Sequence, residues 1–136
     1  MDRVTLDHVA IAVPDLEAAI PRYVALLGRP PAGRERVESE GVEVAFFDVG
    51  GFRIELLEPT AADTPVGRFL ARRGPGLHHI TLAVPDLARA LARCRAQGME
   101  PVGPAPRPGA GGRPVAFLDP KTTGGILVEL VEVPER

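Results

Sequence analysis

The chain has 136 residues, of which 45% are hydrophobic and 25% charged, enough for one compact domain or two small fused modules. A formal net charge of −2 gives no general attraction for nucleic acid or an anionic membrane. The apolar runs are much shorter than the roughly 20 residues of a membrane helix. The amino terminus lacks a signal-peptide core, and one lone cysteine, Cys94, suits a reducing compartment. We therefore expect a cytoplasmic protein with no nucleic-acid or membrane partner.

The first half of the chain predicts a β-α-β-β-β order. The alternating, β-branched stretch Val9–Val13 is typical of a strand and stops at Pro14. A helix should follow, capped at its start by the carboxylate of Asp15, ended by Gly28 and distorted by Pro21. Strand signals then cover residues 36–37, 42–49 and 52–58. Residues 64–74 have apolar side chains at helical spacing and predict a short connecting helix.

The second half repeats the plan of the first. Leu6–Ile20 and Leu77–Leu91 align with eight identities in fifteen positions, including His8 with His79. A strand is predicted at 80–84, a helix between Asp86 and Gly98, and strands at 100–102, 115–118 and 126–133. The sequence thus predicts a single domain made of two modules, 1–63 and 75–136, joined by the helix at 64–74.

Each module has one helix, which can cover only one face of its strands. The two modules should therefore complete each other. We predict an α+β fold in which two tandem βαβββ modules form a cupped, eight-strand mixed sheet with helices outside. Apolar surface left by such small modules would favour a homodimer.

Two histidines and two glutamates recur at matched positions of the repeat: His8 with His79 and Glu55 with Glu129. Any one of them alone is more simply interpreted as a hydrogen-bonded core histidine or an exposed strand glutamate. As two matched pairs, they instead predict one His2Glu2 site for a divalent cation such as Co2+, Ni2+, Zn2+, Mn2+ or Fe2+.

The chain resembles the methylmalonyl-CoA epimerase family of the vicinal oxygen chelate, or glyoxalase-like, superfamily. The segments that carry the resemblance are residues 6–10, 53–59, 73–80, 109–112 and 121–130. The resemblance implies a glyoxalase-like fold, a homodimer, a coenzyme A thioester substrate, and a metal, with Co2+ first, held by His8, Glu55, His79 and Glu129. The implied reaction removes the α proton to form an enolate and returns a proton on the other face.

Two positions depart from the family pattern. Val44 stands where some members have a glutamate proposed as a catalytic base, and Asp119 stands where many have histidine. Because Val44 cannot accept a proton, we expect Glu129 and Glu55 to be the two bases. Glu43 is a further candidate, although one residue along a strand places it on the opposite face.

Three other residues are candidate substrate contacts. Gly111 and Gly112 lie in a glycine-rich loop that could close over substrate or be a plain surface loop, and Lys121 could pair with an anionic group of the substrate or lie exposed in a turn. Two functions remain open beside the epimerase. One is another metalloenzyme of the superfamily, a glyoxalase I or a dioxygenase, and the other is a metal-free binding module.

Overall fold

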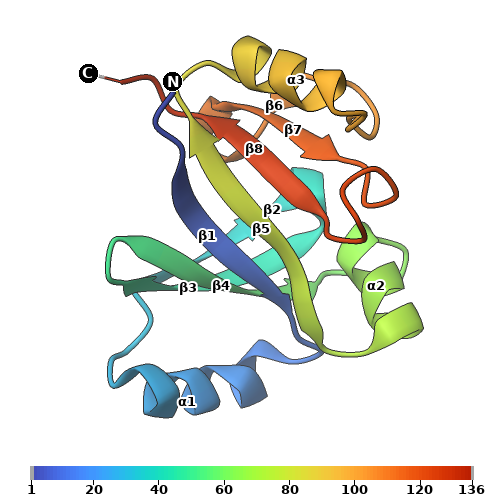
Figure 1. The fold of residues 1–136 in the computed structure, drawn as a ribbon. Coiled ribbons are helices and arrows are strands. Elements are labelled where there is room, and N and C mark those ends of the chain that lie inside the picture. Colours follow the sequence, from blue (N-terminus) through green and yellow to red (C-terminus); the bar gives the residue numbers. More distant parts are fainter. Residues whose placement is uncertain (1, 136) are drawn as a thin grey trace. The chain divides into compact units, whose positions relative to one another are not determined.

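The computed structural model describes residues 2–135, which divide into two compact units. We call His8–His78 the His8 unit, and residues 79–135 together with residues 2–7 the His79 unit. The boundaries between the units fall within the residue ranges of two strands, β1 (Thr5–Ala12) and β5 (Gly76–Val84), both labelled in Figure 1. The predicted modules 1–63 and 75–136 describe the repeat in the sequence and remain a prediction.

The His8 unit contains the strand order β2-β3-β4-β1. β1 is parallel to β4, whereas β2 and β4 are both antiparallel to β3. Its further elements are α1 (Leu16–Leu27), β2 (Gly33–Val37), the 3-10 turn η1 (Glu38–Glu40), β3 (Val42–Val49), β4 (Phe52–Pro59) and α2 (Pro65–Arg73).

The His79 unit repeats this topology in the order β5-β8-β7-β6, with β5 parallel to β8 and the other pairs antiparallel. Its further elements are α3 (Leu87–Ala96), β6 (Arg107–Pro108), the 3-10 turn η2 (Ala110–Gly112), β7 (Pro114–Leu118) and β8 (Val128–Glu132).

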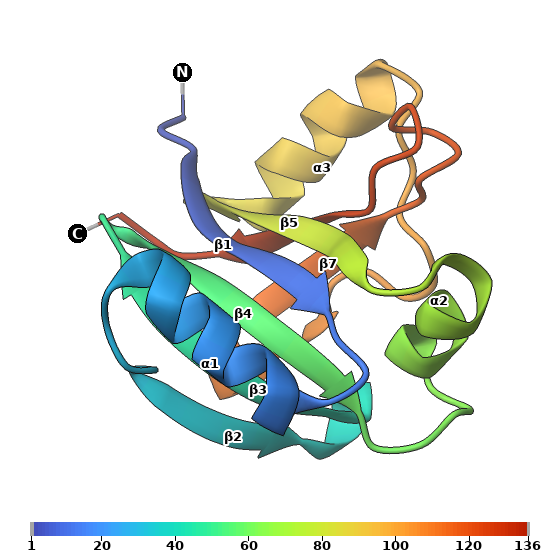
Figure 2. The same cartoon turned by 90° about the horizontal axis from the view of Figure 1, so that it is seen from below.

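In each unit an amphipathic helix buries its apolar face against one face of the strands. α1 lies against one face of β3 and β4 (Figure 2). Leu16 of α1 packs there against Phe47 and Leu56, and Leu91 of α3 packs against Leu130. Burial of each large apolar side chain stabilises the fold by about 1.5–3 kcal/mol. Because side chains alternate along a strand, the residues between these core positions point to the face away from α1 or α3.

A glutamate from the last strand of each unit accepts a hydrogen bond from the first turn of that unit's helix, α1 or α3. The Leu16 amide donates to Glu58 Oε1 at 2.7 Å, and the Leu87 amide donates to Glu132 Oε2 at 2.9 Å. The carboxylates thereby satisfy amides at the positive ends of α1 and α3. Asp15 and Asp86 cap the same helices as predicted, accepting from the amides of the first turn.

The third helix, α2, packs on the other face of the His8 unit. Its Val66 contacts the buried cluster that includes Val44 and Leu57, with Phe69 and Leu70 at the margin. α2 therefore covers part of the face that α1 leaves open. No helix among the described residues is long and apolar enough to cross a membrane.

The order of elements is as predicted, but several bounds differ. The first of the weak strands is β2, which begins at Gly33 and not at residue 36. The predicted strand at 100–102 is only a bridge between Pro101 and Leu118. The strand that pairs with β7 on the side away from β8 is β6. Pro101 has no backbone N–H, and Pro104 and Pro106 follow it, so the segment at 100–102 does not extend into a regular ladder.

Candidate functional site

The first histidine–glutamate pair lies in the His8 unit, on the parallel strands β1 and β4. Ala10 is opposite Glu55 in the register, so His8, two residues before Ala10, shares a face with Glu55. His8 Nδ1 lies 3.6 Å from Glu55 Oε2, and the two side chains are only 12% and 19% exposed. The pair points away from the face that α1 covers.

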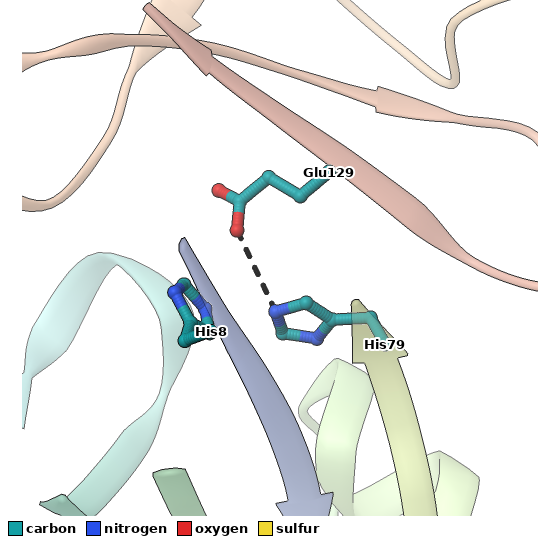
Figure 3. A group of neighbouring side chains, drawn as sticks. All are labelled: His8, His79 and Glu129. Atoms are coloured by element: carbon teal, nitrogen blue, oxygen red, sulfur yellow. Dashed lines mark ion pairs between the residues drawn. The ribbon is translucent and has the colours of Figure 1, made fainter. Parts of the chain in front are cut away.

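The second pair lies in the His79 unit, on the parallel strands β5 and β8 (Figure 3). Thr81 is opposite Glu129, and His79 is two residues before Thr81. His79 Nε2 lies 3.5 Å from Glu129 Oε1, and the side chains are 9% and 13% exposed. The register of the first pair is therefore repeated: a histidine, then two residues later the position that faces the glutamate.

The donor chemistry of the two pairs fits a divalent metal. Each unit offers one imidazole and one carboxylate that are largely removed from solvent. Burial of a carboxylate destabilises the folded protein unless a cation pairs with the charge or hydrogen bonds stabilise it. Nitrogen and oxygen donors of this kind suit the first-row divalent ions. The third histidine, His78, is not part of either pair; its ring meets Phe69 edge-on with centroids 4.9 Å apart.

The glutamates have hydrogen-bonding and aromatic surroundings that sequence reasoning missed. The Thr81 hydroxyl donates to Glu129 Oε1 at 2.6 Å. Phe117 is opposite Glu129 in the register and meets His79 edge-on, with ring centroids 5.6 Å apart. In the His8 unit, Phe46 is likewise opposite Glu55. The alignment of Phe46 with Phe117 in the repeat was the signal that could have revealed these aromatic neighbours.

An arginine lies over each of these phenylalanine rings. The guanidinium carbon of Arg53 is 4.2 Å from the centroid of Phe46, and that of Arg107 is 4.9 Å from the centroid of Phe117. Cation–π contacts of this kind hold the rings and guanidinium groups against each other. In each unit, a phenylalanine therefore lies opposite the glutamate of the His–Glu pair, and an arginine lies over the ring of that phenylalanine.

The structure separates Val44 from Glu43 as the alternation of a strand requires. Val44 is buried opposite Leu57, on the face of Glu55. Glu43 is opposite Glu58, on the face of α1, and its carboxylate accepts a hydrogen bond from Arg36. Glu43 is therefore directed away from His8 and Glu55.

The candidate substrate residues lie in two loops of the His79 unit. Gly111 and Gly112 follow each other with φ angles of 69° and 75°, in the left-handed region that favours glycine. Lys121 lies in the turn between β7 and β8, where its amide donates to Asp119 Oδ1 at 3.0 Å. The Lys121 turn leads into β8, the strand that carries Glu129.

Comparisons with known proteins agree with this arrangement. Residues 7–117 match the Glyoxalase/Bleomycin resistance protein/Dioxygenase superfamily. The ethylmalonyl-CoA/methylmalonyl-CoA epimerase of Cereibacter sphaeroides is 42% identical over 130 residues, covering 94% of this chain and 97% of the relative. The human mitochondrial methylmalonyl-CoA epimerase is 39% identical over 126 residues, covering 92% of this chain and 72% of the relative.

A solved structure extends the likeness to three dimensions. Methylmalonyl-CoA epimerase from Streptomyces coelicolor, in complex with 2-nitronate-propionyl-CoA, superposes with a TM-score of 0.84 at 36% identity, covering 93% of this chain and 92% of that one. The expected glyoxalase-like α+β fold is confirmed, and so is the expectation of an isomerase of the epimerase class, because the relatives bear that name. The chain belongs to the glyoxalase superfamily and, within it, to the methylmalonyl-CoA epimerase family.

Proposed function

We propose that the protein epimerises methylmalonyl-CoA at the carbon between its thioester and its carboxylate. The names of the relatives support this substrate, as does the coenzyme A thioester analogue in the complex of the Streptomyces enzyme. The observation that carries the proposal is the duplication of one His–Glu pair, in the same register, in both units. A reaction that exchanges a proton on two faces of one carbon is served by one proton-transfer group on each face, a role that a carboxylate in each unit can fill.

The proposal includes one divalent cation held by His8, Glu55, His79 and Glu129. Glu55 lies beside His8 in one unit and Glu129 lies beside His79 in the other, and imidazole nitrogens and carboxylate oxygens are donors that divalent ions accept. Co2+ is our first choice from the family resemblance, and Ni2+, Mn2+, Zn2+ and Fe2+ suit the same donors. When bound, such an ion supplies Lewis-acid stabilisation of negative charge on a substrate oxygen.

Within the proposal, Glu129 and Glu55 move the α proton. One of them, as the ionised carboxylate, accepts the proton from one face of the substrate, and the other, as the neutral carboxylic acid, gives a proton to the opposite face of the planar enolate, so that the two exchange ionisation states in each turnover. Each carboxylate has a second oxygen besides the one nearest its histidine. Val44 has no proton acceptor, and Glu43 points to the α1 face, so neither is assigned a role.

Lys121, Gly111 and Gly112 complete the proposal as substrate contacts. The Lys121 ammonium would pair with the free carboxylate of the malonyl unit or with phosphates of coenzyme A. The two glycines present backbone amides with little steric bulk, which allows a loop to approach a ligand closely. A homodimer in the cytoplasm is also part of the proposal, and it rests on the family resemblance and on the lone Cys94.

The decisive experiment uses one stereoisomer of methylmalonyl-CoA in deuterated water with the Co2+-loaded protein. We expect deuterium at the α carbon and formation of the other stereoisomer. Glu129→Gln is the matched comparison, because it keeps the size of the side chain and a ligand oxygen while removing the proton acceptor.

The proposal fails if the protein exchanges no α proton when loaded with any of the five metals. Conversion of the hemithioacetal of methylglyoxal and glutathione would instead indicate a glyoxalase I. A protein that binds none of the five metals would point to a binding module.

A further inference from the structure

The two His–Glu pairs differ in the residue that lies opposite each glutamate. Ala10 and Thr81 correspond in the repeat, and each is opposite the glutamate of its own pair. Ala10 presents only a methyl group, whereas the Thr81 hydroxyl donates to Glu129 Oε1 at 2.6 Å. The symmetry of the repeat is therefore broken beside one glutamate.

The geometry of Thr81 suits it to fix the direction of a carboxylate. Thr81 is 1% exposed, and its β-branched side chain has little freedom about χ1 on a strand. A buried hydroxyl that donates to a carboxylate makes a charge-assisted hydrogen bond, which is stronger than one between neutral groups. The same Oε1 atom lies 3.5 Å from His79 Nε2, so hydroxyl and imidazole converge on one oxygen.

We propose that Thr81 is a positioning residue: its hydrogen bond holds the Glu129 carboxylate in the orientation in which it can both coordinate the metal and accept the α proton. The inference rests on the proposed function, because it takes Glu129 as a ligand and a base. Position 10 supplies no such hydroxyl to Glu55. The two glutamates are thus unequal, with Glu129 held by its strand neighbour and Glu55 held without this bond.

The test uses two pairs of variants that differ only in a hydroxyl at position 81. Thr81→Val is compared with the wild type, and Thr81→Ala with Thr81→Ser. Co2+ affinity is measured by calorimetry without substrate, and kcat and KM are measured with methylmalonyl-CoA. Loss of the hydroxyl should weaken Co2+ binding or lower kcat by roughly 10- to 100-fold in both pairs, the usual effect of removing a group that orients a metal ligand.

Thr5→Val is the control, because Thr5 is an exposed residue on β1 and its variant should bind Co2+ as the wild type does. The inference is overturned if Thr81→Val matches the wild type in both measurements, or if Thr81→Ser is as impaired as Thr81→Ala. It is also overturned if the wild type binds no Co2+. A wild type that binds Co2+ but does not epimerise methylmalonyl-CoA rejects the proposed function instead, and the affinities alone then decide the role of Thr81.

Discussion

Glu43 accepts a hydrogen bond from Arg36 at 3.2 Å, and the two residues face each other across β2 and β3. This pair lies on the α1 face of the His8 unit, because Glu43 is also opposite Glu58, which caps α1. Glu55 lies on the other face. A single residue step along β3 thus separates a surface ion pair from the face of the candidate site.

Glu43→Gln should therefore leave epimerisation unchanged. The substitution weakens a partly exposed ion pair, so the free energy of unfolding should change by no more than about 1 kcal/mol. Steady-state kinetics and urea unfolding check both expectations. Loss of turnover in this variant, with Glu55→Gln nearly normal, would mean that Glu43 is the base and that the faces are misassigned.

Glu55→Gln and Glu129→Gln should each lower epimerisation by roughly 10²- to 10⁴-fold, the contribution of a positioned general base. Both variants should still fold and bind metal, since glutamine keeps an oxygen ligand. Exchange of the α proton with solvent should differ between the two stereoisomers. Each variant keeps the base for one face, so it can still exchange the proton of the isomer that presents its proton to that face. Deuterium incorporation from each isomer, followed by NMR, measures this difference, and identical losses for both isomers would contradict the assignment.

His79→Ala should lose much of the bound metal and nearly all activity, because the imidazole is one of four proposed donors. The neighbouring His78→Ala is a matched control: it removes an imidazole from the same strand, but one that packs on Phe69. Metal content after dialysis separates the two variants. Stoichiometric metal retained by His79→Ala would count against the site.

Much of the geometry of the candidate site could be predicted because the repeat marks the same residue types twice. The match of His8 with His79 and of Glu55 with Glu129 needed only an alignment of the two halves. The alternation of strands then predicted that Glu43 and Val44 lie on opposite faces, as the structure has them. Long, periodic elements such as α1 and β3 were recovered for the same reason.

Other features depend on pairing that a sequence does not display. Thr81 is singled out only by the β5–β8 register, which brings it opposite Glu129. Glu58 and Glu132 look like exposed strand residues until their contacts with the first amides of α1 and α3 are seen. β6 was missed because it is only two residues long and contains Pro108, so it has no alternating β-branched pattern that would mark a strand.

The contact of Glu58 with α1 predicts a stability effect without a catalytic one. Glu58→Ala removes the acceptor for the Leu16 amide at the start of the helix. Loss of such a cap typically costs about 0.5–2 kcal/mol of stability. Urea unfolding should show this decrease, while turnover of the folded protein stays normal because Glu58 lies on the α1 face. A loss of turnover comparable to that of Glu55→Gln would contradict the separation of the two faces.

The ion pair between Asp2 and Arg93 predicts a pH-dependent contribution to stability. Arg93 Nη1 donates to Asp2 Oδ2 at 2.7 Å, and this hydrogen bond, with Arg89 adding to it, holds the pKa of Asp2 below its usual value. A carboxyl whose pKa is lowered by folding stabilises the native state above its unfolded pKa, and this stabilisation is lost as the pH falls through the lowered pKa. Arg93→Gln should thus raise the pKa of Asp2 in an NMR titration, and the variant should be less stable than the wild type near neutral pH, with the difference shrinking in acid.

Arg95→Gln, which removes a guanidinium that contacts Glu100, is the matched control and should leave the pKa of Asp2 unchanged. An equal shift in both variants would mean that general surface charge, and not the hydrogen bond from Arg93, sets the pKa of Asp2.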